Sequence, residues 1–74
     1  MQAGRLSSRQ EEVLALAASG QSRKQMANTL GISENTVKVH AAAIVARLGV
    51  KNMPEAVAVW VRDRERDDVR AGDR

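Results

Sequence analysis

Apolar side chains recur along the chain at the spacing of an α-helix, in short stretches that end at glycines. The third stretch is the most regular, because its apolar residues follow at intervals of four, three and four: Val37, Ala41, Ile44 and Leu48. Two shorter stretches precede it: Val13, Leu14, Leu16 and Ala17, then Met26, Ala27 and Leu30. This pattern predicts short helices joined by tight turns.

Residues that cap helices stand at the start of each stretch. Ser7 to Gln10 and Ser8 to Glu11 both have the spacing of a capping box, in which two side chains satisfy free backbone N–H groups reciprocally. Ser22 to Gln25 has the same spacing, and Ser33 and Asn52 suit the starts of the third and fourth helices. Glycines that tolerate the left-handed conformation mark the helix ends: Gly20, Gly31 and Gly49.

The fourth predicted helix contains six consecutive apolar residues, from 56 to 61. Its β-branched residues would also fit a strand, but the chain has no second strand-like run to pair with it, so we expect a helix. Six consecutive apolar positions cover more than one helical face, and a second apolar face needs a partner. We therefore expect a weak homodimer through this helix, formed by Val57, Ala58, Val59 and Val61.

Composition narrows the class of protein. A chain of 74 residues suits one domain, and the absence of cysteine excludes disulfides and thiolate metal sites. Trp60 is the only aromatic residue, which disfavours stacking of single-stranded bases. No apolar run is long enough to span a membrane, and residues 1–5 hold no apolar signal region, so we expect a cytoplasmic protein.

The sequence offers no recognisable catalytic or metal-binding arrangement. It has no nucleophile–base pair, no glycine-rich phosphate loop and no paired carboxylates around a cleft, and His40 is the only histidine. We therefore predict that the protein is not an enzyme and that it binds no metal and no cofactor.

Positive charge is concentrated in the middle of the chain. The formal net charge is +3, whereas residues 22–51 alone carry +4, with Glu34 as their only acid. The segment from residue 62 to 74 has equal numbers of acids and bases. A basic middle third favours a polyanionic partner such as nucleic acid, although a solvated basic surface is the simpler alternative.

The stretch from Gln21 to Leu48 predicts a helix-turn-helix, in which Gly31 forms the turn between a short and a longer helix. Ser33 and Thr36 would place hydroxyls and free N–H groups at a positive helix end, where a phosphate can bind. Lys38 and Val39 project away from the apolar stripe, on the side that would enter the major groove of double-stranded DNA. Val39 would there contact a thymine methyl group.

These residues resemble the LuxR-type domain, also called the FixJ or GerE type, from residue 6 to about residue 61. The resemblance rests on Leu6 to Arg9, Glu12 to Leu14, Gly20, Lys24, Ala27, Leu30, Ile32, Ser33, Thr36 to Lys38, His40, Ile44, Leu48 to Val50, Ala56 and Val57. Its most specific part is Ile-Ser-x-x-Thr-Val-Lys-x-His. The helix-turn-helix of sigma-factor region four shares the opening but differs in the recognition helix.

The resemblance implies a four-helix domain of a transcription regulator that binds promoter DNA, usually as a homodimer, with its third helix in the major groove. DNA contacts are expected from Lys24, Ser33, Thr36, Lys38, Val39, His40, Ala42 and Arg47. For Lys38 and Val39 the alternative is an ordinary solvated surface position, and two further residues have a competing structural role. Thr36 also suits a purely structural part in the helix cap, and for His40 packing or hydrogen bonding near a helix interface is favoured over a phosphate contact.

The predicted domain spans residues 6–62, after a disordered start or linker over 1–5 and before a charged tail over 63–74. The resemblance implies either a stand-alone regulator or the output module of a larger one, with an N-terminal receiver or sensor domain. An alternative class is a helical protein-interaction module without DNA binding. An exposed face that Lys38 and Val39 share with nearby basic residues would favour DNA.

The chain departs from the family pattern at several positions. Gln10 stands where glutamate is usual, so a charge pair made by that glutamate is not expected. Three alanines, from 41 to 43, replace residues that are often polar or basic, and Met53 replaces a usual arginine. These departures predict weaker DNA binding and an altered target sequence rather than a different fold.

Overall fold

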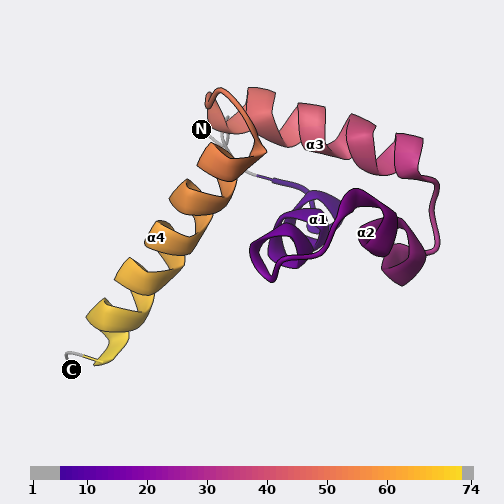
Figure 1. The fold of residues 1–74 in the computed structure, drawn as a ribbon. Helices are drawn as coiled ribbons and strands as arrows, with labels where there is room; N and C mark the ends of the chain where they lie inside the picture. The colour runs from indigo at the N-terminus through magenta and orange to yellow at the C-terminus, as the bar shows by residue number, and fades with distance from the viewer. Residues whose placement is uncertain (1–5, 73–74) are drawn as a thin grey trace.

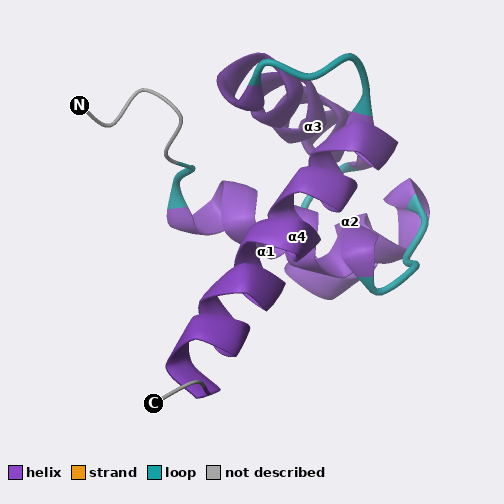
Figure 2. Cartoon of the chain, turned by 90° about the vertical axis from the view of Figure 1, so that its left-hand side faces the viewer, coloured by secondary structure: helices purple, strands orange, loops and turns teal. Residues whose placement is uncertain are grey.

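The computed structural model describes residues 6–72 of the chain, with side chains for residues 6–65. Four helices make up this part, which contains no strand: α1 (Ser8–Ala18), α2 (Arg23–Leu30), α3 (Glu34–Leu48) and α4 (Met53–Gly72). Both α1 and α2 pack against α3, and α4 leaves the end of α3 and packs against α1 and α3 (Figure 1, Figure 2). The predicted all-α, four-helix architecture is confirmed; the predicted linker over 1–5 lies outside the described residues.

Side chains cap the helices where the sequence predicts. Ser7, rather than Ser8, opens α1: Ser7 Oγ accepts from the Gln10 N–H at 3.2 Å, and Gln10 Oε1 accepts from the Ser7 N–H at 2.9 Å. Ser22 and Gln25 form the same box at α2, with distances of 3.1 and 2.8 Å. Asn52 Oδ1 accepts from the Glu55 N–H at 2.9 Å and so begins α4.

The core forms where the apolar stripes of the helices meet. Its buried residues come from all four helices: Val13, Leu14, Met26, Ala27, Val37, Ile44 and Ala56. Leu14 and Ile44 are fully buried, and full burial of such a side chain stabilises a fold by about 1.5–3 kcal/mol. Because α3 uses its stripe for this core, its opposite face remains exposed.

Helix α4 is longer than its apolar run. Ala56 is buried in the core, and Val57 and Trp60 pack against it. The helix then continues through the predicted charged tail as far as Gly72. The sequence there has opposite charges four residues apart, as with Arg64 and Asp68, and like charges at the same spacing, as with Arg62 and Arg66, so the charge pattern alone does not favour helix. The Arg64 guanidinium also lies 4.7 Å from the centre of the Trp60 ring, a favourable cation–π contact.

Candidate nucleic-acid interface

Helices α2 and α3 form the predicted helix-turn-helix. Gly31 joins them with φ +70° and ψ +34°. Residues other than glycine adopt this left-handed backbone conformation only at a cost in free energy. The Ile32 N–H donates to the Ala27 carbonyl at 3.0 Å, and Ile32 packs against the core. The turn is thus held by a hydrogen bond and an apolar anchor, which fixes how α3 leaves α2.

The face of α3 opposite the core is open, as its sequence predicts. Its exposed residues are Asn35, Lys38, Val39, Ala42 and Ala46. Val39 is 60% exposed and is the one large apolar side chain among the described residues that lies mainly in solvent. An isolated exposed valine beside a lysine does nothing for the core, so this face offers a cation and a methyl-bearing surface to a partner.

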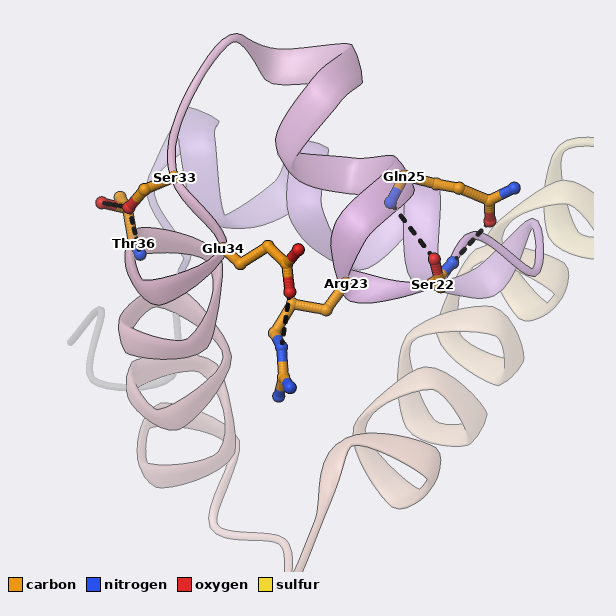
Figure 3. A network of polar contacts seen from close by, with 6 residues as sticks. All are labelled: Ser22, Arg23, Gln25, Ser33, Glu34 and Thr36. Atoms are coloured by element: carbon orange, nitrogen blue, oxygen red, sulfur yellow. Dashed lines mark hydrogen bonds and ion pairs between the residues drawn. The ribbon is translucent and has the colours of Figure 1, made fainter.

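Ser33 and Thr36 form a hydroxyl pair at the N-terminus of α3 (Figure 3). Ser33 Oγ accepts from the Thr36 N–H at 3.0 Å, and the two hydroxyl oxygens lie 2.9 Å apart. One hydroxyl hydrogen joins these two oxygens, so the other is left to donate outward. The pair therefore caps the helix and can still offer a hydrogen bond to an anion.

Charged side chains of α2 border this site. Arg23 and Lys24 occupy the first turn of α2, and both are exposed. Arg23 Nε lies 3.8 Å from Glu34 Oε1, so an ion pair links the starts of α2 and α3 (Figure 3). The sequence gives no direct signal for this pair, because it depends on how the two helices cross.

His40 and Arg47 lie on another side of α3 from Lys38. At 100° per residue they share one side of the helix with Thr36, next to the exposed face. His40 is half-buried and Arg47 is exposed. The predicted contacts therefore fall into two groups, one at the centre of the face and one along its edge. Asn35 is also on the exposed face, in the first turn of α3, and was not among the predicted contacts.

The predicted dimer residues of α4 do not have equivalent surroundings. Val57 packs against the domain's own core, whereas Ala58 is exposed. Val59 and Val61 are half-buried and lie on either side of Ala58 around the helix. The part of this surface that remains open is therefore Ala58 with its two flanking valines.

Other kinds of site find no support in the described part of the chain. No group of three or more histidine, aspartate or glutamate side chains there could hold a metal ion. No helix in residues 6–72 is long and apolar enough to cross a membrane. An open groove between α1 and α4 is lined by Glu11, Glu12, Trp60 and Arg64, among others, and contains no arrangement of catalytic groups.

Comparison with known proteins agrees with this geometry. The family model for bacterial regulatory proteins of the luxR family matches residues 4–60. The putative HTH-type transcriptional regulator YhjB of Escherichia coli is 45% identical over 51 residues, which is 69% of this chain and 26% of YhjB. The probable csgAB operon transcriptional regulatory protein of Salmonella typhimurium is 39% identical over 61 residues, or 82% of this chain and 28% of that protein.

A further relative is the oxygen regulatory protein NreC of Staphylococcus aureus, 42% identical over 52 residues, which cover 70% of this chain and 24% of NreC. The chain thus spans about a quarter of the length of each of these relatives. The similarity includes both helices of the helix-turn-helix, since the family match runs through α2 and α3.

Proposed function

Because the chain belongs to the luxR family of bacterial regulatory proteins, we propose that it binds double-stranded promoter DNA in a sequence-specific manner, as part of a transcription regulator. In this proposal α3 is the recognition helix and lies in the major groove, where its N-terminal half meets the base edges. A regulator of bacterial promoters works in the cytoplasm. In this proposal the domain recognises DNA and catalyses no reaction.

The observation that carries the proposal is the exposed face of α3. Lys38 and Val39 project from it side by side, while the stripe with Val37 and Ile44 is buried. Lysine donates to the acceptor atoms of guanine, and valine makes apolar contact with a thymine methyl group. Ala42 lies one turn further on the same exposed face and would add only an apolar contact.

Contacts to the DNA backbone come from the edges of this face. The hydroxyl pair of Ser33 and Thr36 donates one hydrogen bond to a phosphate at the start of α3, where the helix dipole also favours an anion. Lys24 on α2 and Arg47 at the end of α3 attract phosphates from either side. His40 lies on the half-buried edge of the face. Its main role is to support the helix, and its second role is a contact with a phosphate.

The partners beyond DNA follow from α4 and from the length of the relatives. The open surface around Ala58 is suited to a weak homodimer that would bring two recognition helices to successive major grooves. Because the relatives are about four times as long as the matched region, a receiver or sensor domain that precedes this one is a further expected partner.

Selection of bound sequences from random duplex DNA tests the proposal directly. Repeated capture and amplification should enrich one short motif, and a duplex with that motif should bind more tightly than a scrambled duplex of the same composition. A helical protein-interaction module would instead enrich no motif and would bind both duplexes equally poorly. Such a result would remove sequence-specific DNA binding as the function.

A further inference from the structure

An acid stands inside the basic surface of the helix-turn-helix. Glu34 is the only acidic residue between positions 22 and 51, and it is the first residue of α3. Arg23 is the first residue of α2, and its Nε lies 3.8 Å from Glu34 Oε1. Figure 3 shows the Arg23 side chain extending from α2 towards Glu34, which lies on the opposite side of α3 from Thr36. The pair therefore spans the two helices that form the proposed DNA site.

This ion pair adds little to the fold. The side chains of Arg23 and Glu34 are 55% and 51% exposed, and exposed ion pairs contribute little to stability. An arginine in the first turn of a helix also faces the positive end of the helix dipole, and α2 has no acid in that turn to offset it. Arg23 therefore does not stabilise α2, and its exposed guanidinium lies where an anion that approaches α2 and α3 can reach it.

We propose that Glu34 restrains Arg23 in the free domain and that Arg23 exchanges this carboxylate for a DNA phosphate on binding. The inference rests on the proposed DNA-binding function. Carboxylates and phosphates accept hydrogen bonds from the same guanidinium N–H groups, so they compete for Arg23. Glu34 is then a positioning residue that acts through Arg23, and it lowers the affinity for duplexes of any sequence.

The competition sets the size of the effect. An exposed pair of this kind is populated only a few times more than its open form, so removing Glu34 should tighten DNA binding by about two- to sixfold. The salt dependence should change too. Glu34→Gln removes a negative charge from the interface. The slope of log affinity against log salt should therefore become steeper, by less than the roughly 0.9 that one whole phosphate contact contributes.

A double-mutant cycle tests the exchange. The unmodified domain, Glu34→Gln, Arg23→Gln and the double variant are titrated by fluorescence anisotropy against a duplex obtained by selection and a scrambled duplex. Glu34→Gln should tighten binding to both duplexes, and Arg23→Gln should weaken binding to both. In the Arg23→Gln background, Glu34→Gln should have no further effect, because no arginine remains to be released.

Two further backgrounds, Lys24→Gln and Arg23→Lys, serve as controls for the effect of Glu34→Gln. Lys24→Gln removes the neighbouring exposed cation of the same turn, and in that background Glu34→Gln should still tighten binding as it does in the unmodified domain. Arg23→Lys keeps the positive charge, so Glu34→Gln should tighten binding there as well. Circular dichroism and thermal melting show that each variant is folded; if Arg23→Gln does not fold, Arg23→Ala, which also removes the guanidinium, takes its place in the cycle.

Three results would overturn the inference. Equal tightening by Glu34→Gln with and without Arg23 would mean that the carboxylate repels DNA directly. No tightening in the unmodified background would mean that Arg23 is not restrained. If the unmodified domain binds neither duplex, the proposed function fails and the inference fails with it; binding by that domain together with either of the first two results leaves the function standing.

Discussion

Lys38 is a side chain whose removal should affect DNA binding without affecting folding. It is exposed on the face of α3 opposite the core, beside Val39. No ion pair within the described residues involves it, so its removal leaves no buried charge behind. Lys38 can contact either a guanine base or a DNA phosphate. A guanine contact discriminates between sequences, whereas a phosphate contact does not.

Lys38→Ala should weaken binding to a selected duplex by about 1–3 kcal/mol if Lys38 contacts guanine, and it should relax the preference at one position of the motif. A uniform loss over all sequences would instead indicate a phosphate contact. Anisotropy titrations measure both cases. Arg62→Ala, which removes an exposed cation on α4, is the control and should bind nearly as the unmodified domain does. An unchanged affinity for Lys38→Ala, with an unchanged melting temperature, would remove Lys38 from the site.

Residues whose role follows from helical periodicity could be predicted from sequence, and those whose role depends on helix crossing could not. Val37 and Val39 have the same chemistry, yet their spacing alone predicted that Val37 is buried and Val39 exposed. The choice between Ser7 and Ser8 as the cap needed the structure. Gln10 is only 8% exposed, and a neutral amide costs less to bury than the carboxylate of Glu11, so the box closes on Ser7.

At the level of helices, the two capping boxes form a matched pair. Both join a serine to a glutamine three residues later, with nearly equal hydrogen-bond lengths. They differ in surroundings, because Gln10 is buried beside the core whereas Gln25 is exposed. Substituting each glutamine in turn therefore shows how much burial adds to the stability that a capping box contributes.

Gln10→Ala should lower the free energy of unfolding by about 1–2 kcal/mol, because it removes the box and the packing of a buried side chain. Gln25→Ala should cost less than 1 kcal/mol, since water replaces its hydrogen bond. Chemical denaturation followed by circular dichroism gives both values. Equal losses in the two variants would show that burial of Gln10 contributes nothing to the cap.

Helix boundaries were predictable wherever a capping side chain or a glycine fixes them. Gly49 ends α3 in the left-handed conformation, with φ +70°, as its position after the last apolar residue predicted. The end of α4 had no such signal. The apolar run stops at residue 61, whereas the helix continues as far as Gly72. The last residue of the apolar run therefore does not mark the end of the helix.

Over the whole molecule, a modest positive charge predicts salt-dependent binding of modest strength. With about three to five phosphate contacts, the slope of log affinity against log salt should be near −3 to −4.5 for each bound domain. Ala42→Lys places one more cation on the exposed face and should tighten binding. Anisotropy titrations at several salt concentrations measure both effects. A flat salt response would contradict the assignment of phosphate contacts.

Assembly on DNA is expected to depend on α4. Ala58 faces away from the core with Val59 and Val61 on either side, and burying one valine against a partner would gain only about 1.5 kcal/mol, so the domain should be largely monomeric without DNA. Two half-sites about one helical turn apart should then fill cooperatively.

Val59→Asp should abolish the cooperativity and spare single-site binding, while Val57→Asp, which alters a residue packed on the core, should destabilise the fold. Mobility-shift titrations on one and two half-sites distinguish these outcomes. Independent filling of two half-sites by the unmodified domain, or unfolding of Val59→Asp, would show that this surface of α4 is not the dimer contact.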